Sequence, residues 1–587
     1  MSDTTISKKN SVYSQDIEHL NFSKTESNQT PYPNKHELSE GSKWSRFRDS
    51  FKPAQVSYEL DSEGNQVIQT QGALKRDLQS RHLQMIAIGG SIGTGLLIGL
   101  GGSLATGGPA SLLIAWGLVG TMVFCTVHNL GELCIEYPVN GAFSAYATRF
   151  VDPSWGFAVG WNYALMWLIV LPLELVAAAL CIKYWNSDIN PVAWVGIFYI
   201  AIVIINVFGV RGYGEAEVIL VSVKVMAIVG FIILGVVLVC GGGPTGEFIG
   251  NRYWKNPGAF NHGFKGVCSV FVTASYSLAG TEMVGLAAAE TRNPKTTLPK
   301  AVKQVFWRII FFYILSLTFI GLLVPYDSPE LLGNSGSSAS PFVIAIKSGG
   351  IKVLPSIFNA CILISITSVG NGAVYGCSRT LQSLAEQSLA PKYLGYIDSK
   401  GRPLGALLTS LGFGLLCFLS ALSNVSEVFN WMLSVSGLAT IFSWFSINLA
   451  HWRFRGAWKQ RGRTLDQLHF TSLTGIGGSI YSMAFLTLVL GVQFWIALIP
   501  VGSSKPNAKN FFQNYLGVLV IIVFYIGHKT VTKNWKMIIS LEDIDIDTGR
   551  RFNNAELMKL EKESEEEVVV GEGRLRKFQN IWRLISK

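Results

Sequence analysis

Two short segments with the residue types of a ligand site interrupt long apolar stretches of this chain. The first covers residues 89–95 (GGSIGTG) and the second covers residues 276–282 (YSLAGTE). Glycine costs about 1 kcal/mol relative to alanine inside a helix, so a cluster of glycines predicts a local break. A broken helix exposes backbone N–H groups at a positive dipole end and carbonyls at a negative end. Two such breaks together could hold a molecule that carries both a carboxylate and an ammonium group.

The first segment also has a packing interpretation. Gly89 with Gly93, and Gly95 with Gly99, match G-x-x-x-G, the pattern by which membrane helices approach closely. Irregular backbone is tolerated at membrane depth only where it lines a cavity. The two segments lie in the first and sixth apolar stretches, at corresponding positions of two five-helix blocks, and such paired interruptions point to a transporter binding site. We therefore expect the breaks to form one site.

Ionisable residues inside apolar stretches are the second candidate group, because each costs roughly 2.5–3.5 kcal/mol on insertion scales. Lys224 lies in the middle of a stretch; it could snorkel to an interface, but its central position argues against this. Glu174 and Glu282 lie in the third and sixth stretches. A buried lysine can lose a proton near neutral pH and a buried glutamate can gain one, so these residues are candidates for proton coupling. Glu132 is nearer the end of its stretch, and we expect it to be a structural ion-pair partner.

The composition requires a membrane around most of the chain. The 587 residues are 49% hydrophobic and 15% charged, against about 25% charged in a typical soluble chain. A net charge of +10 would suggest nucleic acid in a soluble protein. Here basic cytoplasmic loops account for it, so we expect no nucleic-acid partner. The sequence contains no P-loop or HExxH motif, and its eight cysteines form no CxxC pair. We expect neither an enzyme nor a metal or cofactor.

Twelve apolar runs of roughly twenty residues, the length that crosses a bilayer, predict an all-α polytopic membrane protein. They lie near 86–105, 111–131, 157–181, 192–208, 217–240, 266–288, 306–325, 354–378, 405–423, 427–449, 479–499 and 513–528. Lys and Arg are more numerous in the loops that follow even-numbered runs, so both termini should be cytoplasmic. The predicted organisation is a mostly disordered N-terminal regulatory tail (1–80), a twelve-helix domain (81–528) and a C-terminal tail (529–587).

With these motifs in view, the chain resembles the amino acid–polyamine–organocation superfamily, and within it the fungal amino acid permeases, from about residue 75 to 552. The resemblance rests on the segments 88–95, 131–133, 171–174, 280–282, 293–295, 324–326, 368–371, 427–431 and 545–550. Residues 240–246 (CGGGPTG) and 264–271 (FKGVCSVF) look most like the general, broad-specificity permeases. In helix six, basic amino acid permeases tend to have Gln-Gly-Thr-Glu where this chain has Ala279-Gly-Thr-Glu, which favours a broad or neutral range.

The resemblance implies a LeuT-like fold of two inverted five-helix repeats with broken helices 1 and 6. It also implies proton-coupled uptake at the plasma membrane by alternating access. Backbone amides would bind the substrate α-carboxylate at Ile92, Gly93, Thr94 and Gly95. The α-ammonium would be held by carbonyls around Ser91, Tyr276 and Ala279, in the same break as Ser277 and Gly280.

The resemblance also assigns roles to individual side chains. Tyr276 would be an aromatic gate and Glu282 an acidic gate residue. Lys224 matches a fifth-helix lysine that replaces a sodium ion in proton-coupled bacterial relatives. Ser368 and Ser436 fall where helices eight and ten would line the side-chain pocket.

We therefore predict a plasma-membrane amino acid:proton symporter of broad range. One alternative is a permease for basic or for one neutral class of amino acids. The other is a non-transporting amino acid sensor on the same fold, although such sensors carry a much longer N-terminal tail. By the resemblance, Lys8, Lys9 and Lys24 would be targets of the ubiquitin-ligase machinery that acts on the tails.

Overall fold

The computed structural model describes residues 48, 50–53, 57–60, 66–69, 74, 78–90, 92–185, 189–291, 294–333, 340–421, 425–548 and 550. It separates into two units, residues 1–52 and 53–587, and the fold below is that of the second. Predicted Ser91 and the tail lysines lie outside the described residues.

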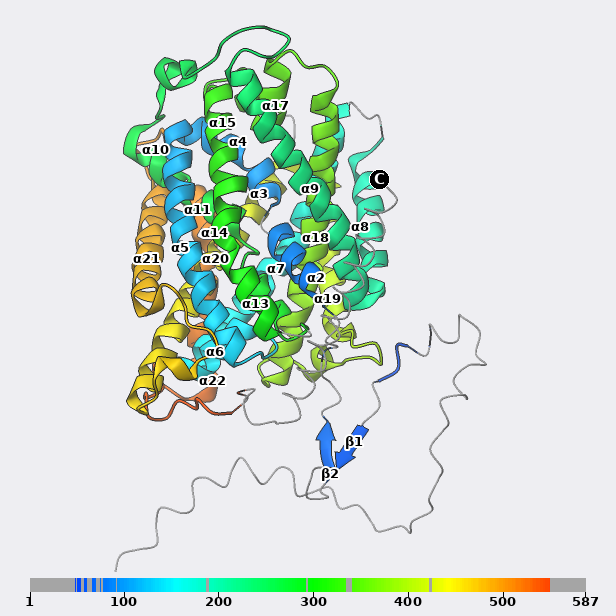
Figure 1. The fold of residues 1–587 in the computed structure, drawn as a ribbon, viewed down its shortest axis with the longest axis vertical. Coiled ribbons are helices and arrows are strands. Elements are labelled where there is room, and N and C mark those ends of the chain that lie inside the picture. The colour runs from blue at the N-terminus through cyan, green and yellow to red at the C-terminus, as the bar shows by residue number, and fades with distance from the viewer. Residues whose placement is uncertain are drawn as a thin grey trace, which may run out of the picture. The chain divides into compact units, whose positions relative to one another are not determined.

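Helices that run side by side make up almost all of the described residues of this unit (Figure 1). The first half contains α2 (Ser80–Gly89), α3 (Thr94–Leu97), α4 (Leu100–Gly107), α5 (Pro109–Glu136), α6 (Ala142–Phe150), α7 (Pro153–Ile182), α8 (Pro191–Val207), α9 (Gly209–Val239), α10 (Gly263–Ser269), α11 (Phe271–Leu278) and α12 (Met283–Ala287).

The second half continues with the same architecture. It contains α13 (Pro294–Lys303), α14 (Val305–Arg308), a π-helical turn (Ile309–Ile314), α15 (Leu315–Leu323), α16 (Pro329–Gly333), α17 (Pro341–Ser348), α18 (Leu354–Glu386), α19 (Leu404–Gly414), a 3₁₀ turn (Leu415–Ala421), α20 (Val425–Gln460), α21 (Gly475–Leu498) and α22 (Ala508–Thr532).

The described residues include nine helices that are long and apolar enough to cross a membrane. The pair Ser80–Leu97 and Leu100–Gly107, bent by 52°, would make a tenth span. Two shorter apolar helices, Pro191–Val207 and Leu404–Leu419, coincide with the fourth and ninth predicted runs. Each predicted run thus overlaps a helix, and the prediction of an all-α polytopic membrane protein is confirmed. The inverted five-helix repeats stay a prediction.

A short antiparallel hairpin lies within the segment predicted to be the N-terminal tail. Strand β1 (Ser57–Leu60) pairs with β2 (Gln66–Gln69), and Tyr58 is opposite Ile68. The chain then enters α2, just before which the Leu78 N–H donates to the Glu290 carbonyl at 3.1 Å. This bond places the start of the first span beside the end of the sixth. We call the side of the bundle on which Leu78 and Glu290 lie the terminal face.

The two glycine-rich segments are breaks, and they touch each other. Gly93 is extended (φ −147°, ψ −156°) between α2 and α3, and residues 279–282 separate α11 from α12. Gly280 has φ +88°, and a Cβ added there would lie 2.4 Å from the Gly90 carbonyl oxygen. Close packing is present as well, because a Cβ on Gly89 would lie 2.3 Å from the Val221 side chain. The glycines therefore serve both interpretations: they open the helices and let the backbones approach.

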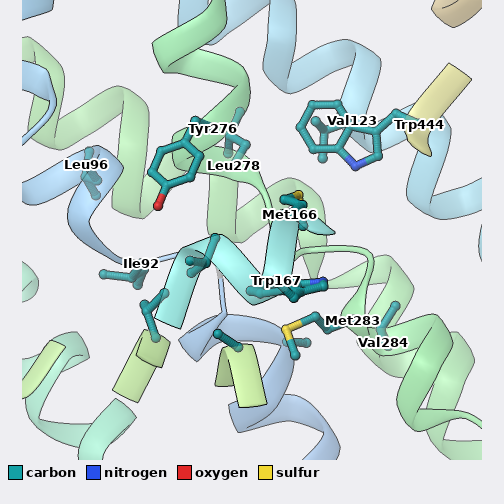
Figure 2. Packing of buried hydrophobic residues seen from close by; sticks show 14 of the residues in the cluster. Ile92, Leu96, Val123, Met166, Trp167, Tyr276, Leu278, Met283, Val284 and Trp444 are labelled. Carbon is teal, nitrogen blue, oxygen red and sulfur yellow. The ribbon is translucent and has the colours of Figure 1, made fainter. Parts of the chain in front are cut away.

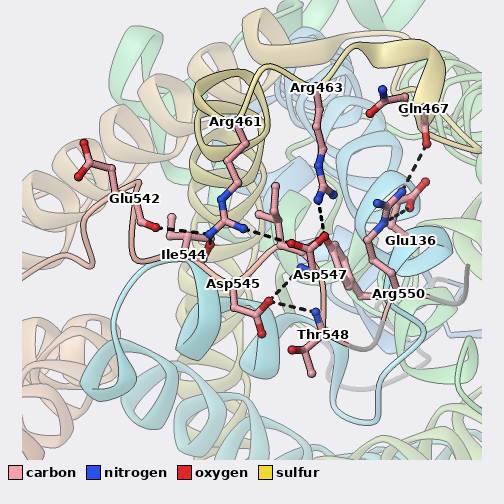
Figure 3. A network of polar contacts seen from close by, with 12 residues as sticks. Glu136, Arg461, Arg463, Gln467, Glu542, Ile544, Asp545, Asp547, Thr548 and Arg550 are labelled. Carbon is pink, nitrogen blue, oxygen red and sulfur yellow. Dashed lines mark hydrogen bonds and ion pairs between the residues drawn. The ribbon is translucent and has the colours of Figure 1, made fainter. Parts of the chain in front are cut away.

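A segment that follows α22 packs against the terminal face (Figure 3). Ile544 and Ile546 are fully buried there. The Tyr137 hydroxyl donates to the Ile546 carbonyl at 2.7 Å, and the Arg461 guanidinium donates to the Ile544 carbonyl at 2.6 Å. Asp547 pairs with the Arg461 guanidinium at 3.2 Å. This part of the predicted C-terminal tail is a structural element that joins α5 to the end of α20.

The contact between the breaks predicts the effect of Gly280→Ala. A methyl group would collide with the Gly90 carbonyl, and alanine at positive φ costs about 1–3 kcal/mol. We expect the apparent melting temperature of the detergent-solubilised protein to fall. Gly230→Ala on exposed α9, where a Cβ meets nothing within 4 Å, is the matched control and should not lower it. Equal melting temperatures for Gly280→Ala and the wild type would contradict this packing.

The C-terminal contacts predict different effects for two truncations. A chain that ends at residue 538 loses the buried Ile544 and Ile546 and leaves the Arg461 guanidinium without three of its acceptors. We expect a lower melting temperature and a smaller folded fraction in size-exclusion chromatography. A chain that ends at residue 550 keeps these contacts and should behave as the full chain does. The same loss in both truncations would show that residues after 550 carry the effect.

Candidate binding site at the two helix breaks

A narrow cavity of about 20 Å³ lies between the two breaks. This volume holds about one water molecule, so a larger ligand would require the surrounding helices to move apart. Figure 2 shows Tyr276, Met166 and Trp167 around it, with Ile92 close to the first break. The lining residues are Gly90, Gly93, Thr94 and Gly95 from the first span, Met166, Trp167, Val170 and Glu174 from α7, Tyr276, Ser277 and Ala279 from the sixth span, and Val369 from α18. The structure thus brings together seven of the predicted residues from spans one, three and six.

The first break presents unpaired backbone donors to this cavity. Within the described part of the chain, the N–H groups of Gly93, Thr94 and Gly95 have no hydrogen-bond acceptor, as expected at the start of α3. The N–H of Ile92 is different, because it donates to the Ile88 carbonyl at 3.3 Å. Ile92 is predicted to bind a carboxylate, yet it is fully buried and is not among the residues that line the cavity.

Glu174 connects the two breaks from the third span. The Thr94 hydroxyl donates to one carboxylate oxygen of Glu174, and the Tyr276 hydroxyl donates to the other at 3.4 Å. The Glu174 side chain is 1% exposed and is the one ionisable carboxyl group among the lining residues described. An acidic group beside three free N–H groups gives the cavity acceptors as well as donors.

Lys224 reaches the first break from α9. Its ammonium donates to the carbonyls of Gly89 at 2.8 Å and Ile92 at 3.0 Å, and the residue is 2% exposed. It therefore does not snorkel to an interface. The Ser365 hydroxyl of α18 donates to the same Ile92 carbonyl at 3.3 Å. A positive charge at the carbonyl end of α2 complements the helix dipole and satisfies carbonyls that the break has freed.

Glu282 closes the second break on the side of the terminal face. Its carboxylate accepts bonds from the Gly280 N–H at 3.1 Å, the Tyr163 hydroxyl at 3.1 Å and the Trp444 indole N–H at 3.2 Å. It is fully buried and is not among the residues that line the cavity. Glu282 thus ties the sixth span to α7 and α20.

Further toward the terminal face lies a buried ion pair that is not part of the cavity lining. Glu290 lies 3.1 Å from the Arg379 guanidinium and accepts a bond from the Tyr375 hydroxyl at 2.7 Å. The Tyr375 ring stacks on Tyr213, with ring centroids 4.5 Å apart. Glu132 forms the expected structural ion pair, at 2.6 Å from Arg455.

Tyr276 separates the central cavity from a second cavity on the opposite side. The second cavity holds about 210 Å³. It is lined by residues of α10, α11, α20, α21 and α22, with Pro500 and Val501 from the loop between the last two spans. Tyr276 lines both cavities and is 8% exposed. Its position is that of a barrier between them.

Two predicted pocket residues occupy other positions. The Ser368 hydroxyl donates to Glu217 of α9 at 2.7 Å, and the Ser436 hydroxyl donates to the Met432 carbonyl at 2.8 Å. Both serines are buried and neither is among the residues that line the central cavity. A role of these serines in substrate contact stays a prediction.

The sequence analysis did not identify the apolar wall of the cavity on α7. Met166, Val170 and Glu174 are four residues apart, so they share one helix face. Spacing from Glu174 could have identified the other two. The sequence analysis also missed Glu217, which lies seven residues before Lys224 and therefore on the same face of α9.

Comparisons with known proteins identify the family of this chain. The model of the amino acid permease family matches residues 82–540. The amino-acid permease GAP3 of Candida albicans is 62% identical over 92% of this chain and 94% of its own length. The general amino-acid permease GAP2 of the same organism is 54% identical over 92% and 93%. The tryptophan permease of Saccharomyces cerevisiae is 53% identical over 83% of each chain. The chain belongs to the amino acid permease family.

Proposed function

We propose that this permease imports a broad range of L-amino acids across the plasma membrane together with protons, by alternating access, and that both of its termini are cytoplasmic. The observation that carries the proposal is the meeting of the two breaks around one cavity, with the Lys224 ammonium on the carbonyls of Gly89 and Ile92. Each part of the proposal follows from a different set of contacts.

The cavity has the polarity that an amino acid backbone needs. The free N–H groups of Gly93, Thr94 and Gly95 suit the α-carboxylate, and the positive end of α3 points in the same direction. The Glu174 carboxylate and the carbonyls of the second break suit the α-ammonium. Because both charged groups of the substrate bind to the breaks, the side chain is left to face the rest of the cavity.

The apolar wall supports a broad range. Met166, Trp167, Val170 and Val369 face the remaining space and carry no charge. Apolar pockets discriminate weakly, by about 1–3 kcal/mol for one methylene group. A narrower permease is the second candidate, and the 53% identity to a tryptophan permease favours it.

Two barriers support alternating access. Tyr276 lines both the central cavity and the second cavity, and the buried Glu290–Arg379 pair would act as the barrier on the side of the terminal face. In transport, Tyr276 would move first to admit the substrate. The ion pair would then separate to release it to the cytoplasm.

Lys224 supports proton coupling. A protonated lysine holds the carbonyls of the first break, and a neutral lysine would hold them less strongly because charge-assisted hydrogen bonds are about twice as strong as neutral ones. Proton loss to the cytoplasm would thus loosen the first break and promote release. The next proton from outside would restore it.

Uptake of labelled amino acids by permease-deleted yeast that expresses this chain tests the function. We expect accumulation of several chemical classes that is stronger at acidic than at neutral external pH and is abolished by a protonophore. Competition among the twenty amino acids measures the range. Uptake of one class alone would establish the narrower permease. No uptake by a protein that is present at the cell surface would contradict transport and favour the sensor.

Lys224→Ala tests the coupling role. The change removes two charge-assisted hydrogen bonds, each worth about 1.5–3 kcal/mol, and we expect the accumulation ratio to fall at least about tenfold at equal surface abundance. Lys352→Ala, at an exposed position outside the site, is the matched control and should accumulate substrate as the wild type does. Full concentrative uptake by Lys224→Ala would rule out this assignment.

A further inference from the structure

Glu217 is a buried carboxylate that has no role in the transport cycle described above. It lies in α9, within the span Gly212–Val239, and is 1% exposed. The Ser368 hydroxyl donates to one of its oxygens at 2.7 Å, and the Asn371 amide donates to the other at 3.2 Å. Asn371 in turn accepts a bond from the Asn206 amide of α8 at 2.7 Å. Spans four, five and eight therefore meet at this carboxylate.

Glu217 and Lys224 lie on either side of the same residue of the first span. They are seven residues apart on α9, about two helical turns, so both side chains point toward the end of α2. A Cβ added to Gly89 would lie 2.8 Å from a Glu217 carboxylate oxygen, and the Lys224 ammonium lies 2.8 Å from the Gly89 carbonyl oxygen. An acid and a base on one helix face thus contact the backbone at the first break.

The other groups around Glu217 are neutral or engaged elsewhere. From α18, the Glu217 carboxylate accepts bonds from the Ser368 hydroxyl and the Asn371 amide. Asn371 accepts in turn from the Asn206 amide of α8. Toward the terminal face, the His82 ring of α2 lies against Gly214 and pairs with Glu215 at 3.2 Å, and Tyr213 stacks on Tyr375. Arg379 of α18 pairs with Glu290, and Glu174 of α7 is bonded to Thr94 and Tyr276. Lys224 is the cation that shares the face of Glu217.

A buried carboxylate without a compensating charge is expensive. The described residues form no direct ion pair between Glu217 and Lys224, so the compensation acts across Gly89, which both side chains approach. The pair as a whole is neutral only while Lys224 carries its proton. Loss of that proton would leave Glu217 as an uncompensated anion beside the Gly89 backbone. The acid therefore opposes proton loss until the surrounding helices move.

We propose that Glu217 is a positioning residue for transport: its carboxylate keeps Lys224 charged on the first break and fastens α9 to α18, so that proton loss and movement of the break occur together. The proposal rests on the proton coupling proposed above. In this arrangement Ser368 acts on Glu217 and not on the substrate.

Glu217→Gln tests the proposal, because glutamine keeps the shape and an oxygen that accepts from Ser368 but removes the charge. Lys224 would then lose its proton more readily. We expect half-maximal uptake to move to a more acidic external pH and the accumulation ratio to fall about tenfold. Exchange of labelled for unlabelled amino acid at equal pH on both sides should stay within about threefold of the wild type. Glu215→Gln, two residues away on the exposed face and paired with Arg81, is the matched control and should change neither quantity.

A purely structural role would give a different result. Surface abundance and exchange would then fall together while the pH of half-maximal uptake stayed unchanged, and that outcome would overturn the proposal. Wild-type accumulation and an unchanged pH midpoint in Glu217→Gln would overturn it as well. Should Glu217→Gln fail to reach the surface, Ser368→Ala replaces it. For Ser368→Ala we expect the pH of half-maximal uptake to shift in the same direction as in Glu217→Gln, but by less, and the substrate KM to stay unchanged. A pH of half-maximal uptake equal to that of the wild type would contradict the proposal.

A double variant separates this proposal from proton coupling itself. If wild-type uptake is insensitive to pH and to a protonophore, the proton coupling in the proposed function is wrong. The interaction of Glu217 with Lys224 is then tested by amino acid exchange alone. Lys224→Gln with Glu217→Gln leaves a neutral pair, so we expect more exchange than Lys224→Gln alone gives. If the fold-change in exchange of the double variant equals the product of the two single-variant fold-changes, the two residues do not act as a pair.

Discussion

A helix that opens at membrane depth frees backbone N–H and carbonyl groups, and each of these must find a partner where no lipid can supply one. In this permease several of the freed groups are satisfied by side chains, either from neighbouring spans or from the break itself. Lys224 satisfies the carbonyls of Gly89 and Ile92, and Glu282 satisfies the N–H of Gly280. The Tyr313 hydroxyl satisfies the Ser277 carbonyl at 2.8 Å. The N–H groups of Gly93, Thr94 and Gly95 are left over, and they face a cavity. The candidate binding site is therefore the part of the break that the described residues leave unpaired.

The same constraint explains why ionisable residues gather at the breaks. Glu174, Lys224, Glu217 and Glu282 are all buried, and each has a hydrogen-bond partner on another span. A change in the charge of one of them alters how firmly two spans are held together. This link between charge and packing is what a transporter driven by an ion gradient requires. Glu174 lines the central cavity and Lys224 holds the first break beside it, so under the proposed function substrate binding and proton transfer would influence each other over short distances.

Much of the fold could be predicted because it follows from composition. Runs of apolar residues locate the long apolar helices of the described residues, and glycine beside polar residues locates both breaks. Lys224 and Glu174 were identifiable because a charge inside an apolar run is expensive. Glu217 was harder to recognise, since it lies near the start of α9 and looks like an interface residue until its spacing from Lys224 is considered. Ser368 and Ser436 could not be placed from the sequence, because the face that a serine presents within a long helix depends on the packing of its neighbours. The burial of Ile544 and Ile546 could not be predicted either, because the segment around them has the composition of a polar tail.

The central claim is that an amino acid and a proton move together through a site that Lys224 controls. Proton entry into proteoliposomes that contain the purified permease and a pH-sensitive dye, with membrane potential clamped at zero, measures this directly. The account predicts that adding an accepted amino acid outside acidifies the interior, and that Lys224→Ala abolishes this acidification. Entry of labelled amino acid into the same vesicles without any proton movement would contradict it.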